Sequence, residues 1–505
     1  MAANVTTTSI LQSWTLPADL SGVSLWYSGL AIVGSLLVFE QIVYRQKKQH
    51  LPGPAWKIPV IGKFMDSRFP TMEKYKLGWK QGDLSAVSVF NIFIVMATTN
   101  DYTRRIFNSP AYAEPCLVAS AKQVLEPDNW VFLNGKEHVD YRRILNTLFT
   151  RKALSLYLPM QDTLTRRHIA RWLVEADLKK KPQEIMTRLR DVNMEISLKV
   201  FCGSHIPDSA IAVIVDRYWT ISIALQLVNF PFAIPGTATY RAIQARKEAM
   251  KFLTAAAASS KAAMAAGREP ECMIDEWVVE IRKAQAAGKL NRDFSDREMA
   301  LVVLSFLFAS QDAMSSGLVY MFQHFADHPD ILARTRKEQE EVRGGNYDAP
   351  LTLDMIDEMH YMKACIKESM RVQPPVTMVP YLTTKPFPIS PDYTVPKGTM
   401  VIPSVWPSCY DEEVFPDPAK FIPERWLDEK SIANMNPNKY LVFGSGPHRC
   451  IGMEYAKIVM SVILGNSAVL MNWEHHRTGD SETPILLPTL FPKDGCIVTI
   501  EPRKQ

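Results

Sequence analysis

The ten residues Phe443-Gly444-Ser445-Gly446-Pro447-His448-Arg449-Cys450-Ile451-Gly452 place a single cysteine in a glycine-rich loop. The apolar periodicity of the segment that follows, 455–473, predicts a helix. A cysteine before a helix N-terminus is favoured as a thiolate, and glycines let a bound group approach the backbone. One thiolate is a poor zinc site but suits haem iron, which takes a single axial sulfur. Taken alone, a cysteine such as Cys450 is much more often an inert, buried core residue.

The arrangement Phe-x-x-Gly-x-His-x-Cys-x-Gly resembles the haem-binding loop of the cytochrome P-450 superfamily. That resemblance implies a mainly α-helical fold with small β-sheets, in which haem b lies between a long distal helix and a proximal cysteine loop. It implies that Cys450 is the iron ligand and that Phe443, Gly446, His448 and Gly452 surround the cofactor.

A second candidate for cofactor binding is the segment 129–149, in which His138 and Arg142 are four residues apart. On a helix this spacing puts both side chains on one face, where an anion could accept hydrogen bonds from each. Without other information, a solvated helix face is the favoured interpretation of such a pair. The resemblance implies that both residues hold a haem propionate.

The longest helical pattern runs from Ser295 to Ala326, with Ser295 and Glu298 placed to form a capping box. Asp312 lies in an apolar run of this pattern, and an acid there is a functional candidate.

In the family this helix covers the distal face of haem and carries Ala/Gly-Gly-x-Asp/Glu-Thr. Ala309 and Asp312 match that pattern, whereas Ser310 replaces its glycine and Ala313 its threonine. Because that threonine hydroxyl normally supports proton delivery, Ser315, Ser316 or ordered water is expected to replace it, or the oxygen chemistry differs.

The segment 354–371 predicts a second helix with Thr352 as its N-cap. Within it Glu368 and Arg371 share a face. The resemblance implies that they form a buried structural triad with Arg425 of Pro423-Glu424-Arg425-Trp426.

Two further segments resemble walls of the substrate pocket. The first, 376–383, is predicted to be strand and precedes a predicted turn at 396–398, and the second is 484–492. Their composition is apolar, which favours a large hydrophobic substrate. The predicted substrate contacts are Ala309, Ala313, Val376, Met378, Val379 and Leu490.

Composition sets broad limits on the class of protein. With 47% hydrophobic and 22% charged residues, the 505-residue chain has ample material for a core. A net charge of +4 gives no case for nucleic-acid binding. Seven scattered cysteines, odd in number and without a C-x-x-C pair, argue against a disulfide framework.

The N-terminal region predicts a membrane anchor. The uncharged run 20–39 is long enough as a helix, about 30 Å, to cross a bilayer. The basic residues Arg45, Lys47 and Lys48 follow it, so the positive-inside rule places the N-terminus in the lumen. The predicted organisation is a lumenal segment 1–19, a transmembrane anchor 20–44, a basic and proline-rich hinge 45–62 and a haem-thiolate catalytic domain 63–505.

Within the body, 84–98 predicts a pair of strands, and helices are predicted around 142–149, 163–176, 192–201 and 242–266. The apolar segment 221–235 has two interpretations of equal weight. It is either core packing or a lip of the substrate channel that dips into the bilayer surface.

Within the superfamily, stretches 129–142, 308–313 and 379–398 resemble the fungal sterol C-22 desaturases, in which the threonine-to-alanine change is usual. The resemblance implies dehydrogenation of a sterol side chain at C-22 and C-23 in ergosterol biosynthesis. It implies O2 as co-substrate, electrons from NADPH through NADPH-cytochrome P-450 reductase, and residence in the endoplasmic reticulum membrane. Participation of cytochrome b5 is left open.

Three other functions remain open from the sequence. The first is another membrane-bound member of the superfamily, such as a sterol 14-demethylase or a lipid hydroxylase. The second is a haem-thiolate isomerase or dehydratase that needs no electrons, which the missing threonine permits. The third is a non-catalytic carrier of haem or sterol.

Overall fold

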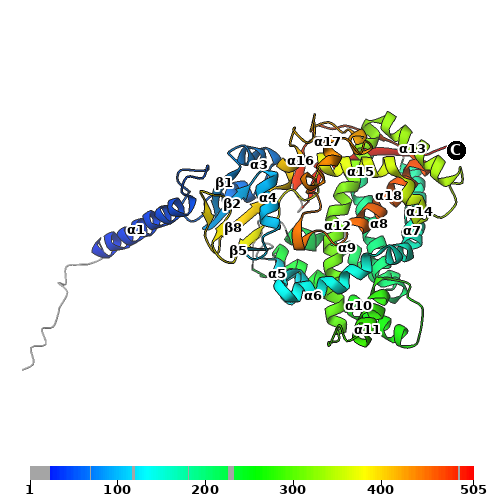
Figure 1. The fold of residues 1–505 in the computed structure, drawn as a ribbon, viewed down its shortest axis with the longest axis horizontal. Helices are drawn as coiled ribbons and strands as arrows, with labels where there is room; N and C mark the ends of the chain where they lie inside the picture. Colours follow the sequence, from blue (N-terminus) through cyan, green and yellow to red (C-terminus); the bar gives the residue numbers. More distant parts are fainter. Residues whose placement is uncertain are drawn as a thin grey trace, which may run out of the picture.

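The computed structural model describes residues 23–68, 70–116, 120–179, 181–225, 232–486 and 489–504. The predicted lumenal segment 1–19 and the first residues of the predicted anchor lie outside these ranges. One helix projects from a body in which a sheet region lies next to the anchor and a larger helical region lies beyond it (Figure 1).

The helices are α1 (Val23–Lys48), α2 (Phe64–Arg68), α3 (Met72–Trp79), α4 (Asn100–Phe107), α5 (Ala121–Leu125), α6 (Gly135–Leu145), α7 (Arg151–Lys179), α8 (Ile185–Cys202), α9 (Asp208–Ala224), α10 (Ala238–Ala265), α11 (Met273–Ala286), α12 (Asp296–Asp327), α13 (Pro329–Arg343), α14 (Leu353–Glu358), α15 (His360–Val372), α16 (Val405–Cys409), α17 (Ile432–Met435) and α18 (Met453–Leu470). Short 3-10 turns are η1 (Trp130–Phe132), η2 (Asn146–Phe149), η3 (Gly203–His205), η4 (Pro423–Trp426), η5 (Pro437–Lys439) and η6 (Gly446–His448).

The strands are β1 (Leu84–Val89), β2 (Ile92–Ala97), β3 (Ala113–Pro115), β4 (Gln183–Glu184), β5 (Tyr381–Thr383), β6 (Phe387–Pro388), β7 (Thr394–Val395), β8 (Met400–Pro403), β9 (Met471–His475), β10 (Pro484–Leu486), β11 (Leu490–Pro492) and β12 (Ile497–Pro502). The largest sheet has the order β1-β2-β8-β5-β3, and a second sheet has the order β4-β12-β9.

Several local predictions are confirmed. The predicted strand pair is the antiparallel hairpin β1–β2, in which Leu84 faces Ala97. Helix α12 begins after Ser295, whose side chain and that of Glu298 form the predicted capping box. Mainly helical structure with small sheets is likewise observed.

Two predicted helices differ from the structure. The segment 354–371 is not one helix: Thr352 caps α14, and the chain leaves helical geometry at Met359 before α15 begins. The helix after the cysteine loop ends at Leu470 rather than Trp473, because Met471 to Trp473 pair with β12 as strand β9. Of the segment interpreted as strand at 376–383, only Tyr381–Thr383 is strand β5; Met378 makes an isolated bridge to Ser404.

The anchor helix α1 reaches Lys48, so the first basic residues of the predicted hinge are helical. Its exposed side chains include Trp26, Leu30 and Phe39, as a lipid-facing helix requires. Helices α12 and α18 are also long and apolar enough to cross a membrane, but 78% and 72% of their apolar windows are buried in the molecule. They are therefore core helices of the body.

The proline-rich joint folds back along α1 rather than leading away from it. Gln41 exchanges two hydrogen bonds with the backbone of Lys57, at 2.9 and 3.0 Å. The Glu40 carboxylate pairs with the Lys57 ammonium, and the Tyr44 hydroxyl donates to the Pro54 carbonyl. These contacts attach the last turns of the anchor to the body.

Candidate haem-thiolate site

Cys450 lies where the sequence predicts, directly before α18, which begins at Met453. Its backbone N–H donates to the carbonyl of Phe443 at 2.9 Å, which closes the loop. The residue is exposed, yet burial raises the pKa of its thiol; the Gly452 N–H and the charges of Arg142 and Arg449 oppose that rise. Together these observations place the thiol on the wall of an internal space.

The loop around Cys450 depends on Gly446. This residue has φ +71°, and a Cβ there would approach the carbonyl oxygen of Phe107 to 2.2 Å. Only glycine therefore lets the loop lie against the end of α4. Phe443 and Gly452, the other predicted loop contacts, are partly exposed on the same loop.

The predicted propionate ligands converge beside the cysteine loop. The His138 and His448 rings stack with centroids 4.0 Å apart, although one belongs to α6 and the other to η6. Burial, followed by the charges of His138 and Arg142, lowers the pKa of His448 to about 4. Arg142 donates to the carbonyl of Arg449, next to the cysteine.

Neutral imidazoles and a guanidinium next to one thiol form a donor set that fits an iron porphyrin carrying carboxylates.

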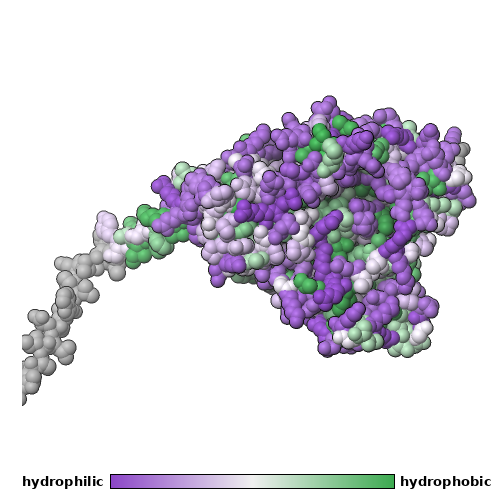
Figure 2. All heavy atoms as spheres, viewed as in Figure 1, coloured by the Kyte–Doolittle hydropathy of each residue, from purple (hydrophilic) through white to green (hydrophobic). Residues whose placement is uncertain are grey.

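The predicted distal side of the haem site lies on α12, where two alanines keep accessible surface although the helix is otherwise mostly buried. Most of α12 is buried, but Ala309 is exposed and Ala313, one turn further, is partly exposed. Small side chains that remain accessible in the middle of a core helix indicate an internal space on that side. Figure 2 shows this face of the molecule hollowed near its centre, with hydrophobic residues at the bottom of the hollow.

Asp312 points away from that accessible stripe. Its carboxylate is buried and pairs with the guanidinium of Arg190 on α8. Arg190 in turn stacks on the ring of Trp219, 4.3 Å from its centroid. The second carboxylate oxygen of Asp312 has no hydrogen-bond partner among the described residues.

The two candidate hydroxyls on α12 are engaged elsewhere. Ser315 is fully buried and accepts a hydrogen bond of 3.3 Å from Asn193 of α8. Ser316 is also fully buried and donates to the carbonyl of Leu490.

The predicted structural triad is assembled. Glu368 and Arg371 are 0% exposed, and the guanidinium of Arg371 binds both carboxylate oxygens at 2.8 and 2.9 Å. Arg425 donates to the same carboxylate at 2.8 Å. The sequence interpretation missed the indole of Trp426, which donates to Glu368 at 2.8 Å. A buried charge is stable only when hydrogen bonds satisfy it. The Glu368 carboxylate accepts such bonds from Arg371, Arg425 and Trp426.

The predicted substrate contacts separate into two groups. Val376, Met378 and Val379 retain accessible surface, as a pocket wall requires. Leu490 does not: it is 0% exposed and packs in a core cluster with Tyr320 and Trp406. Leu490 thus lacks the accessible surface of the other three residues, and its contact with substrate stays a prediction.

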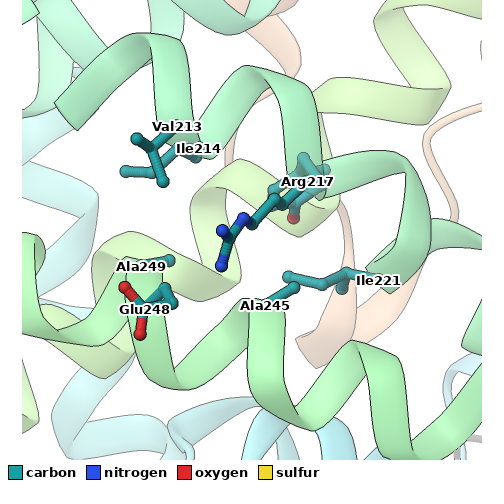
Figure 3. A pocket seen from close by; sticks show the side chains of 8 residues that line it. Val213, Ile214, Arg217, Ile221, Ala245, Glu248 and Ala249 are labelled. Carbon is teal, nitrogen blue, oxygen red and sulfur yellow. The ribbon is translucent and has the colours of Figure 1, made fainter. Parts of the chain in front are cut away.

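A narrow, tightly packed pocket lies between α9 and α10 (Figure 3). Its lining combines apolar side chains with Arg217 and Glu248 and includes none of the predicted site residues. Tyr218, which also lines it, is buried beside Asp312 and Arg190, and burial followed by the charge of Asp312 raises its pKa well above the usual value. The pocket is thus separate from the cysteine loop.

The fold and the site define a haem-thiolate protein, and comparison with known proteins agrees. The sequence model of the cytochrome P450 family matches residues 52–499, so the chain belongs to the cytochrome P450 family. The solved structure of a retinoic-acid-bound cyanobacterial CYP120A1 superposes with a TM-score of 0.77 at 20% identity, covering 90% of this chain and 99% of that one.

Characterised relatives are more similar in sequence. The C-22 sterol desaturase of Aspergillus fumigatus is 41% identical, with 95% of each chain covered. That of Saccharomyces cerevisiae is 40% identical, covering 93% of this chain and 88% of the relative. The cytochrome P450 monooxygenase oblE of Emericella variicolor is 39% identical, covering 96% of this chain and 95% of the relative.

Proposed function

We propose that this cytochrome P450 is a sterol C-22 desaturase of ergosterol biosynthesis. The observation that carries the proposal is the similarity of about 40%, over nearly the whole chain, to C-22 sterol desaturases from several fungi. The apolar wall at Val376, Met378 and Val379 and the small side chains of Ala309 and Ala313 suit a hydrophobic side chain such as that of a sterol.

The reaction removes one hydrogen from C-22 and one from C-23 of the sterol side chain and forms a double bond between them. One O2 accepts these two hydrogens together with two electrons from NADPH and two protons, and leaves as two waters. The haem, held by Cys450, supplies the oxidising chemistry at its iron when it is bound. His138, Arg142 and His448 would bind its carboxylates.

The chain's own share of this chemistry is positioning and proton control. The small side chains of Ala309 and Ala313 would leave room for the sterol side chain beside the bound haem. The Asp312 oxygen without a partner is the atom we assign to proton transfer, with Arg190 holding the other oxygen. Ser315 and Ser316 remain the predicted alternatives, although their hydroxyls are bonded to Asn193 and to the Leu490 carbonyl.

Location and partners complete the proposal. The chain is held in the endoplasmic reticulum membrane by the single anchor α1, with the N-terminus in the lumen and residues 63–505 in the cytosol. NADPH-cytochrome P-450 reductase supplies electrons, and cytochrome b5 is an optional second donor. The exposed apolar residues of α1 and the basic residues at its end support this orientation.

The test is reconstitution of the full-length, haem-loaded protein with the reductase, NADPH and an ergostane-type sterol saturated at C-22. The expected product is two mass units lighter, with the double bond at C-22. The Cys450→Ala variant should lose the reduced carbon-monoxide band near 450 nm and the activity, whereas Cys116→Ser should keep both. Retention of the band and the activity in Cys450→Ala would overturn the proposal.

The same assay separates the other functions. A product sixteen mass units heavier would indicate hydroxylation, which the similarity to the monooxygenase oblE keeps as the second candidate. Loss of a carbon would indicate demethylation, and turnover without NADPH would indicate an isomerase or dehydratase. Stoichiometric sterol binding without any product would indicate a carrier.

A further inference from the structure

Two pairs of residues that commonly bind metals meet where the end of α8 lies next to the start of α11. Cys202-Gly203-Ser204-His205 ends α8 and forms η3, and Cys272-Met273-Ile274-Asp275 begins α11. Each spacing places two ligand types three residues apart. The two segments are nearly seventy residues apart in sequence and come from different helices.

Three of these side chains converge on one point. The ligand atoms of His205, Cys272 and Asp275 all lie within 4.8 Å of one another, the one such group found among the described residues. The His205 Nε2 atom is 2.9 Å from Asp275 Oδ1. Cys272 and Asp275 are 0% exposed, so the group is shielded from water. The sulfur of Cys202 lies outside the group.

The surroundings orient each of these ligands. The other ring nitrogen of His205, Nδ1, lies 2.9 Å from the hydroxyl of Ser259, which fixes the ring. Asp275 accepts hydrogen bonds from the Ser260 hydroxyl and, through its second oxygen, from the Glu271 N–H at 3.2 Å. Metal-bound histidines and carboxylates are held by such outer contacts in the same way.

The backbone also fits closely around the sulfur. Gly203 has φ +56°, and a Cβ on it would come within 3.1 Å of Cys272 Sγ. A glycine is therefore required for the turn between Cys202 and His205 to wrap around the thiol.

We propose that His205, Cys272 and Asp275 bind a divalent zinc ion, with water in the fourth position. Nitrogen, sulfur and carboxylate oxygen form a donor set typical of zinc, whereas magnesium and calcium prefer oxygen alone. A thiolate and a carboxylate balance the two positive charges, so the buried site is neutral. The ion joins η3 to the N-terminus of α11 and, through Ser259 and Ser260, to α10.

None of the three ligands belongs to the haem site, so this inference is independent of the proposed reaction. The test uses the full-length, haem-loaded protein, equilibrated with Zn²⁺ and then passed through gel filtration. Elemental analysis should find about one zinc per chain. Zinc X-ray absorption should show one sulfur neighbour at about 2.3 Å together with nitrogen or oxygen neighbours.

Variants decide between bound zinc and a metal-free hydrogen-bond network. Cys272→Ser should lower the zinc content at least about tenfold, while Cys365→Ser, a buried thiol elsewhere, should retain the ion. His205→Gln provides a second test if Cys272→Ser does not fold, and the carbon-monoxide spectrum reports folding of each variant. Wild type without zinc, zinc retained in Cys272→Ser or His205→Gln, or a zinc spectrum without sulfur would each overturn the proposal.

Discussion

Asp312 shows how a single residue acquires its properties from partners distant in the sequence. The sequence singles it out as an acid in an apolar run, but its state depends on Arg190 of α8. Arg190 is 8% exposed, and the face of Trp219 covers its guanidinium. Because water does not reach this buried pair, the Arg190 guanidinium supplies the counter-charge of the Asp312 carboxylate.

Breaking this pair should destabilise the protein, because it leaves a buried carboxylate without a counter-charge. Arg190→Gln should lower the melting temperature of the haem-loaded protein by roughly 5 °C or more. The double variant Arg190→Gln/Asp312→Asn should recover much of that loss, since the uncompensated charge is gone. Melting is followed by the haem absorbance. Equal melting temperatures for Arg190→Gln and wild type would contradict the pairing.

A buried histidine makes stability depend on pH. His324 stacks on Phe421 with centroids 4.3 Å apart, and burial, reinforced by the charge of His328, lowers its pKa to about 3. The unfolded chain takes up this proton near pH 6.5 and the folded chain does so only near pH 3. The stability that His324 contributes is therefore complete above about pH 6.5 and is lost as the pH falls toward 3.

His324→Phe should accordingly lose less stability than wild type on acidification. Melting temperatures measured between about pH 7 and pH 4.5 should fall less steeply in this variant. His360→Asn, which changes an exposed histidine, should follow wild type. A slope in His324→Phe as steep as that of wild type would show that other groups control the acid sensitivity.

At the scale of elements, the anchor and its joint form one unit. A proline-rich segment is expected to be stiff because proline restricts φ. The structure adds that this segment runs back along α1, where Gln41 and Tyr44 hold it. The hydroxyl of Tyr393, the residue before strand β7, donates to the carbonyl of Lys47 at 2.7 Å. The angle between the anchor and the body is therefore set by hydrogen bonds as well as by prolines.

Gln41→Ala removes both hydrogen bonds to Lys57 and should loosen this joint. In vesicles, cleavage by a non-specific protease within residues 49–62 should become about tenfold faster. Gln46→Ala, an exposed neighbour on the same helix, provides the control. Unchanged cleavage in Gln41→Ala would mean that the remaining contacts hold the joint without it.

At the scale of the whole molecule, the segment 221–235 combines buried and exposed apolar residues. Ile221, Ala224 and Leu225 are buried at the end of α9, which is core packing. Phe232 and Ile234, before α10, are 60% and 53% exposed. Residues 226–231 lie outside the described ranges. If α1 anchors the chain in a membrane as proposed, this exposed apolar pair suits contact with the bilayer surface, from which a sterol would enter.

Replacing this pair should weaken capture of a membrane-bound sterol without affecting the haem. Phe232→Ser/Ile234→Ser should raise KM for sterol in vesicles about fivefold or more, with an unchanged carbon-monoxide spectrum. Val174→Ser, at an equally exposed apolar position on α7, should leave KM unchanged. An unaltered KM in the double variant would place sterol entry elsewhere.

The sequence alone predicted what depends on local order and on motif. The cysteine loop before a helix, the capping box of α12, the β1–β2 hairpin and the pairing of Glu368 with Arg371 each rest on residues close in the chain or on a recognisable pattern. Residue types at fixed spacing carry that information because neighbours in sequence are neighbours in space.

Only the tertiary structure decided the contacts between distant segments. Arg190 opposite Asp312, the Leu490 side chain turned into the core, and the meeting of His205 with Cys272 and Asp275 leave no local signal. The same holds for the end of α18, where pairing with β12 draws Met471 into a strand despite its helical periodicity. In each case the packing of another element, and not the local sequence, determines the outcome.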